Sequence, residues 1–139
     1  MGLKELFEKR LLVKIPIDKN KIVGSIKTSD IKIEEAKKLF QDEYFNQVIV
    51  SAYTSMFHAA RAMLYKDGVQ EKSHYAVYFY LTEKYRDEIS KSLLISFDNY
   101  REQRHNALYG FEYHAKEEEA ENIIKDAEDF LDKIKEILN

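Results

Sequence analysis

The sequence predicts an all-α protein, built as an up-and-down bundle of four to five main helices. Two stretches, 45–66 and 116–138, repeat apolar residues at the i, i+3, i+4 spacing that gathers them on one face of a helix. One proline and four glycines in 139 residues leave little room for the turns of a β fold. Because long helices joined by short connections pack as bundles, we expect a single helical domain over residues 1–139.

The N-terminal third is expected to hold two of the helices. A short amphipathic helix is predicted over 3–12 and is broken before Pro16, because the residue before proline disfavours the helical conformation. Apolar residues over 22–40 predict a second helix. Gly24 and the polar residues that follow it weaken this helix and could divide it into two pieces. Residues 42–46 then form a tight connection.

Four further helical segments are predicted, at 45–66, 73–86, 87–110 and 116–138. Gly68 stands where the C-terminal cap of the first of these belongs, and Asp87 is a plausible N-cap, with Ser90 following. The segment 73–86 is rich in aromatic residues: Tyr75, Tyr78, Phe79, Tyr80 and Tyr85. Aromatic rings at helical spacing usually fill a bundle core, which is our main expectation; a dimer interface and a stacking surface for bases are the alternatives.

Composition excludes several classes of protein. The net charge of −3 argues against coating nucleic acid by bulk attraction, so any RNA contact needs a local positive groove. The absence of cysteine excludes disulfides and thiolate metal sites and fits a cytoplasmic protein. No run of 18 apolar residues predicts a membrane span, and the acidic first eight residues do not form a secretory signal.

No metal or cofactor site is expected. The four histidines do not form an H-x-x-x-H pair, and neither a glycine-rich phosphate loop nor a nucleophile elbow is present. His58 lies beside the apolar stripe of its helix and is interpreted as a packed or hydrogen-bonded core histidine. Ser73 is interpreted as a helix cap, with His74 held by local hydrogen bonds.

The most informative segment is 101–110, which reads REQRHNALYG and holds two of the five arginines. On a helix Arg101 and Arg104 are i,i+3 neighbours, and His105 is four residues from both Arg101 and Tyr109. Guanidiniums and an imidazole on one face repel each other, so an anion explains their grouping better than stability does. The alternative is an ordinary solvated helix face.

Three features together resemble the HEPN family of small all-helical proteins. They are the helix that begins AYTSMFHAARAML at Ala52, the glycine turn at Gly68 with Ser73-His74 beyond it, and the later arginine cluster. Members of the family show an Ala-Tyr-x-x-Met-Phe-His-Ala-Ala type of helix, a Ser-His pair and an Arg-polar-x-x-x-His signature in this order. The resemblance covers the chain from about Ile33 to the C-terminus.

The resemblance implies site residues, with one departure from the family pattern. Arg104 and His105 match the start of the signature, but Tyr109 stands where ribonuclease members carry histidine. The resemblance therefore implies Arg104, His105 and Tyr109 as catalytic candidates, with Arg101 and Arg104 binding phosphate. A tyrosine with a pKa near 10, against about 6.5 for histidine, is a poor general base at neutral pH.

Two functions follow from the resemblance. The first is a toxin-like, metal-independent endoribonuclease, and the second is a non-catalytic module that binds a nucleotide, RNA or an acidic protein surface. In this family the usual partner is a minimal nucleotidyltransferase that acts as antitoxin. In some members it adenylylates a tyrosine near the signature, which by position is Tyr109, or second Tyr113. We also expect a homodimer, partly from the resemblance and partly because two copies could frame a groove with their arginines.

Overall fold

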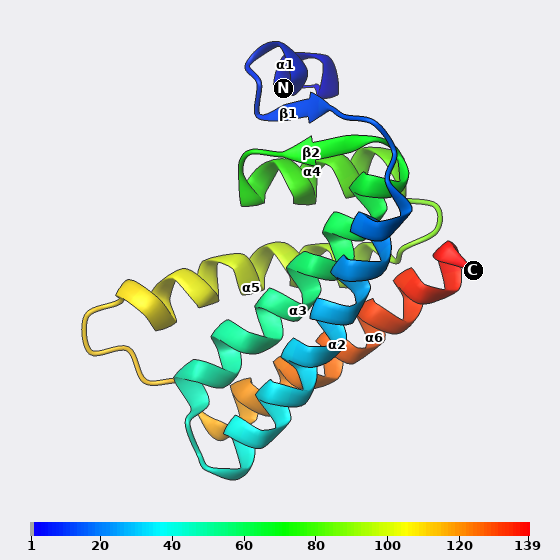
Figure 1. Ribbon diagram of the computed structural model, residues 1–139. Helices are drawn as coiled ribbons and strands as arrows, with labels where there is room; N and C mark the ends of the chain where they lie inside the picture. Colours follow the sequence, from blue (N-terminus) through cyan, green and yellow to red (C-terminus); the bar gives the residue numbers. More distant parts are fainter. Residues whose placement is uncertain (1) are drawn as a thin grey trace.

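Three long helices lie side by side and form the body of the protein (Figure 1): α2 (Lys19–Gln41), α3 (Phe45–Lys66) and α6 (Glu117–Leu138). The computed structural model describes residues 2–139. Helix α3 is central, because it packs against both α2 and α6. Its small residues Ala52, Ala59 and Ala60 are fully buried, which lets neighbouring helices approach closely. The all-α bundle predicted from the stripes of α3 and α6 is confirmed.

Three further helices complete the fold: α1 (Leu3–Glu8), α4 (His74–Lys84) and α5 (Lys91–Tyr109). They lie at the end of the body where α2 begins and along one of its sides (Figure 1). Helix α5 crosses α3 and contacts α4. Only two of its residues, Leu94 and Phe97, are buried. The ring of Phe97 lies 5.6 Å from that of Tyr53 and 5.1 Å from that of Phe130, measured between centroids. This aromatic stack fastens α5 to α3 and α6.

A small antiparallel sheet, which the sequence did not predict, pairs β1 (Leu12–Lys14) with β2 (Val69–Glu71) near α1 (Figure 1). The first helix is therefore shorter than the predicted 3–12 and ends at Glu8. Arg10, with φ of 60°, turns the chain out of the helix. Gly68 allows the pairing, because its φ is 71° and a Cβ there would lie 2.9 Å from the carbonyl oxygen of Ile15. Strands this short give no alternation that could be recognised in a sequence.

The predicted second helix is found as α2, which is continuous through Gly24, so of the two possibilities left open it forms one piece. The polar run after Gly24 makes a close helix contact. The Ser29 hydroxyl donates to the Ser55 carbonyl at 2.7 Å, and the Ser55 hydroxyl donates to the Ser29 carbonyl at 2.8 Å. Both serines are fully buried. Each serine hydroxyl has a hydrogen-bond partner, so these small polar side chains can be buried between the two helices without breaking α2.

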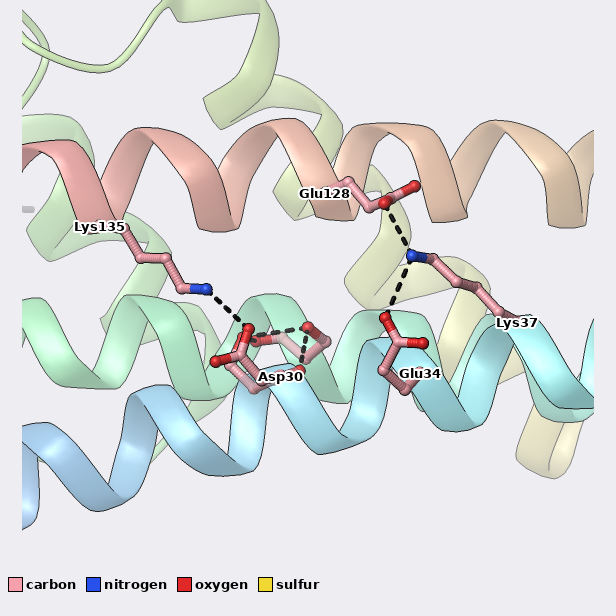
Figure 2. A network of polar contacts seen from close by, with 7 residues as sticks. Asp30, Glu34, Lys37, Glu128 and Lys135 are labelled. Atoms are coloured by element: carbon pink, nitrogen blue, oxygen red, sulfur yellow. Dashed lines mark hydrogen bonds and ion pairs between the residues drawn. The ribbon is translucent and has the colours of Figure 1, made fainter.

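Ion pairs on the outer face connect α2 to α6, as Figure 2 shows. The ammonium of Lys37 lies 3.2 Å from Glu34 and 3.0 Å from Glu128, and Lys135 lies 2.8 Å from Asp30. The carboxylates raise the pKa of Lys37, that of Glu128 most. Such exposed pairs contribute at most about 1 kcal/mol each, so they favour one register of the two helices more than they stabilise the fold.

Two boundaries on either side of the α4–α5 connection differ from those expected. Helix α4 ends at Lys84, and α5 begins at Lys91 with Ser90 as its cap, because the Ser90 hydroxyl accepts the N–H of Leu93 at 3.2 Å. Asp87 is not the cap and lies in the connecting turn.

The aromatic residues of the predicted 73–86 segment divide between core and surface. Tyr80 and Tyr85 are buried, and both hydroxyls donate to Asp67, at 2.9 Å and 2.5 Å. Burial, with this carboxylate, raises the pKa of both phenols. Tyr75 is exposed, and Tyr78 and Phe79 are half-buried. Core packing is therefore confirmed for Tyr80 and Tyr85, and Tyr78 and Phe79 pack against the edge of the core. Within residues 2–139 no helix has both the length and the apolar character that crossing a membrane requires.

Candidate functional site

The C-terminal half of α5 carries the arginine cluster. Beyond Phe97 this helix has no buried residue, so its side chains there are available to solvent and to a neighbouring pocket. Next to it, α4 begins with Ser73, whose hydroxyl accepts the N–H of Ala76 at 3.0 Å, as predicted for a cap. This cap places His74 and Tyr75 in the first turn of α4.

A pocket of about 590 Å³ lies between these two helix segments. Its lining joins the first residues of α4 to one face of α5: Ser73, His74, Tyr75, Arg101, Glu102, Arg104, His105 and Asn106. The structure therefore brings Arg101, Arg104 and His105 together, as the i,i+3 and i,i+4 spacing predicted. The pocket lining contains two guanidiniums and one carboxylate, in a chain whose net charge is −3.

The two arginines differ in how they are held. The Arg101 Nε donates to Asp98 at 2.9 Å, and its guanidinium lies 5.6 Å from the centroid of the Tyr75 ring. The Arg104 guanidinium lies 5.9 Å from the centroid of the Tyr53 ring. Within residues 2–139 Arg104 forms no ion pair, so its charge is free to meet an anion. Arg104 is half-buried, because it packs over this ring.

His105 and Tyr109 lie at the open side of the pocket. Both are exposed, and their ring centroids are 5.0 Å apart. Tyr109 is 70% exposed and does not line the pocket itself. Tyr113, the second tyrosine considered for modification, is tied into the fold. Its hydroxyl accepts from the Gln103 amide at 3.3 Å and donates to Glu119 at 3.2 Å.

The sequence interpretation placed His74 outside the site, with local bonding. Its partner is instead distant in sequence, because its Nδ1 lies 3.0 Å from the hydroxyl of Tyr53, 21 residues away. Its ring also stacks on that of Phe57, 4.1 Å between centroids. Burial, followed by the charges of Arg104 and Arg101, lowers the pKa of His74 despite the opposing carboxylate of Glu71. The one available signal was the Ser-His pair within the family resemblance.

The other histidines do not contribute to this pocket. His58 is half-buried on α3 with its ring against the edge of Phe57, and burial, together with Arg61, lowers its pKa. It has no hydrogen-bond partner within the described residues, so of the two expected alternatives it is packed. His114 is exposed on the connection to α6. Across residues 2–139 the side chains of His, Cys, Asp and Glu do not gather in a group of three that could hold a metal ion.

Two guanidiniums beside an aromatic ring and a neutral imidazole suit a phosphate-bearing ligand. A guanidinium can grip two phosphate oxygens at once, and a neutral imidazole can still take up a proton. The fold and the pocket therefore define a small helical protein with a cationic site between two helices.

Comparison with known proteins identifies the family. The HEPN domain model matches residues 24–137, and the chain belongs to this family. It is 30% identical over 125 residues to a Methanocaldococcus jannaschii protein named "Putative toxin MJ0605", covering 86% of this chain and 90% of that protein. It is 32% identical over 120 residues to an Archaeoglobus fulgidus UPF0332 protein, covering 82% and 92% of the two chains. A second M. jannaschii protein, "Putative toxin MJ0142", is 24% identical over 122 residues, covering 86% and 83%.

Proposed function

We propose that this HEPN protein is a toxin-like, metal-independent endoribonuclease that is paired with a minimal nucleotidyltransferase. The observation that carries the proposal is the pocket in which Arg101 and Arg104 converge, with the Arg104 charge unpaired. The toxin names of two relatives support the same class of function. The proposal takes residues 1–139 as one domain and places it in the cytoplasm, where RNA and the partner enzyme would meet it.

In this proposal the 2′-hydroxyl of the RNA attacks the neighbouring phosphorus, and the 5′ oxygen leaves. Negative charge builds on the phosphoryl oxygens, and Arg104 stabilises it while Arg101 holds the same phosphate. His105 and Tyr109 are the side chains of α5 considered for moving the proton. Because Arg104 lies against Tyr53 and has no carboxylate partner among residues 2–139, its charge is both oriented and available.

One observation favours a second function. Tyrosine replaces the signature histidine at 109, and its phenol is a poor base at neutral pH. A non-catalytic module would use the same arginines to hold a nucleotide, an RNA end or an acidic protein surface without cleaving it. Incubating the purified protein with single-stranded RNA in the presence of a chelator separates the two functions. Cleavage supports the ribonuclease, whereas binding without cleavage supports the module.

The exposure of Tyr109 supports it as the adenylylation target. Its hydroxyl has no hydrogen-bond partner within residues 2–139, whereas that of Tyr113 is engaged by Gln103 and Glu119. Incubation with a minimal nucleotidyltransferase and ATP should therefore add AMP to the wild-type protein but not to Tyr109→Phe, as read by intact-mass spectrometry. Tyr113→Phe is the matched control and should still be modified. Modification of Tyr109→Phe would remove this assignment.

The proposed function also includes a homodimer. Tyr75 on α4 and Ile95 on α5 are exposed, at 43% and 45%, on the two helices that we expect at the contact. Tyrosine and apolar side chains are common at such interfaces. Light scattering at micromolar concentration should give twice the chain mass of 16.5 kDa. A single species at the monomer mass would contradict the dimer.

A further inference from the structure

We propose that His74 is the proton-carrying residue of the Arg101–Arg104 pocket and that its Nε2 exchanges a proton with the ligand held there. The inference rests on the proposed function in taking that ligand to be a phosphate ester. It assigns to α4 the chemical group that the signature in α5 lacks, since position 109 holds tyrosine.

The ring of His74 is held in one orientation from its buried side. Its Nδ1 faces the hydroxyl of Tyr53 at 3.0 Å, and Tyr53 is fully buried in the core. Its face stacks on Phe57, with the centroids 4.1 Å apart. Since His74 also lines the pocket, and Nε2 has no hydrogen-bond partner within residues 2–139, that nitrogen is the one available to a ligand. His105, by contrast, is exposed and has no such anchor.

The Tyr53 hydroxyl can stay hydrogen-bonded to His74 whether the imidazole is neutral or charged. A hydroxyl can both donate and accept, so it can accept from Nδ1–H while Nε2 either lacks or carries a proton. Burial raises the pKa of Tyr53, so the phenol stays protonated and adds no negative charge beside the imidazole. When the hydroxyl accepts from Nδ1–H, the lone pair is on Nε2, which is the form that a general base needs.

The charged and titratable groups around His74 favour its neutral form. They come from three elements: Tyr53 and Arg61 on α3, Glu71 on β2, and Arg101 and Arg104 on α5. Glu71 is the one group that would favour the charged form, but Arg61 pairs with it at 2.6 Å. Burial and the α5 arginines outweigh it and lower the pKa of His74. At neutral pH the imidazole is therefore ready to accept a proton.

The proposed step balances without a metal or another reactant. Nε2 of neutral His74 takes the proton of the RNA 2′-hydroxyl as that oxygen bonds to phosphorus. The bond from phosphorus to the 5′ oxygen breaks, and the 5′ oxygen takes a proton from water, leaving a cyclic phosphate and a free 5′-hydroxyl. The imidazolium then gives its proton to the hydroxide formed from that water, which restores the neutral imidazole and the water.

Variants test the catalytic part. His74→Ala should slow cleavage of a single-stranded RNA by roughly 100- to 10,000-fold, the usual contribution of a general acid or base. Its affinity for a 2′-O-methyl RNA, which cannot be cleaved this way, should change little. Added imidazole should restore part of the rate. His58→Ala removes another half-buried histidine whose pKa is lowered, and it should cleave like wild type. Equal rates for His74→Ala and wild type would overturn the inference while leaving the ribonuclease standing.

A second measurement does not depend on cleavage. Sulfate mimics a phosphate, and its own charge does not change near neutral pH. If it binds beside Nε2, it favours the imidazolium, so the pKa of His74 should rise on adding sulfate, as followed by NMR of the ring protons. His58 should not respond, and Arg104→Ala should abolish the response of His74.

The cleavage assay and the sulfate titration distinguish failure of the proposed role of His74 from failure of the proposed ribonuclease activity. Absence of cleavage by wild type would remove the proposed ribonuclease, and the sulfate titration would then decide the role of His74 by itself. A His74 pKa that ignores sulfate overturns the inference in either case. Tyr53→Phe gives a readout that lost packing alone would not produce: it removes only the hydroxyl, and it should shift the pH profile of cleavage.

Discussion

Replacing Arg104 by alanine is expected to slow RNA cleavage by roughly 30- to 1,000-fold, which corresponds to about 2 to 4 kcal/mol of lost transition-state stabilisation. The guanidinium lies over Tyr53 and has no ion-pair partner within residues 2–139, so its charge is not already neutralised. An oriented cation of this kind acts on the charge that develops during the reaction, and its loss should lower the rate constant more than the affinity for RNA.

The loss of activity should reflect the planar guanidinium, which can bind two phosphate oxygens at once, and not only the positive charge. Arg104→Lys keeps the charge but presents a single ammonium, so it should recover only a small part of the activity. Arg86→Ala is the matched control, because Arg86 is exposed on the α4–α5 connection and lies outside this pocket. It should cleave like wild type. The rates are to be measured on one RNA at saturating and at low concentration, which separates kcat from kcat/KM.

Stability should change little in Arg104→Ala, since a partly exposed contact of a cation with a ring is worth about 0.5 to 1 kcal/mol. The thermal transition of the variant therefore checks that lost cleavage reflects lost chemistry. A contrary result is also informative. If Arg104→Ala alters neither RNA cleavage, nor RNA binding, nor partner binding, then the cluster on α5 is a solvated helix face.

Local sequence pattern accounts for most of the helices. The predicted 45–66 agrees with α3, and the predicted 116–138 with α6 to within one residue, because each has an apolar stripe long enough to define its period. The same reasoning placed Arg101, Arg104 and His105 on one face. The small sheet was missed and the continuity of α2 was left open, since both depend on contacts between segments distant in the chain, such as Ser29 with Ser55.

Only the part of the candidate site that lies on α5 could be predicted from the sequence, for a similar reason. Residues on one helix can be placed together from their spacing, as the arginines of α5 were. His74 reaches the same pocket through the packing of α4 and through Tyr53 of α3, and no spacing rule relates those three helices. A histidine next to a capping serine has an adequate local explanation, which hides its role until the tertiary contact is seen. Tyr109, by contrast, was expected in the site and lies at its edge.

Replacing Phe97 by alanine should lower the free energy of unfolding by about 3 to 5 kcal/mol, as large-to-small changes of buried aromatic residues do. Phe97 is 1% exposed and stacks with both Tyr53 and Phe130. It is one of only two buried residues of α5; the other ties of this helix to α6 are hydrogen bonds at its partly exposed side, from Tyr100 to Asp126 and from Gln103 to Glu119. The cavity left behind cannot close without moving α5, which also positions Arg101 and Arg104.

Urea unfolding at constant pH measures this effect, with the slope of the transition checked for constancy between variants. Ile31→Ala is the control, because Ile31 is 62% exposed on α2, outside the expected dimer contact, and should cost much less. Phe97→Leu should retain most of the stability, since it preserves more of the buried volume. A loss below about 1 kcal/mol in Phe97→Ala would mean that α5 is held by other contacts. If the loss is as large as expected, sulfate binding should weaken in Phe97→Ala even under conditions where it remains folded, because the arginines depend on this ring for their position.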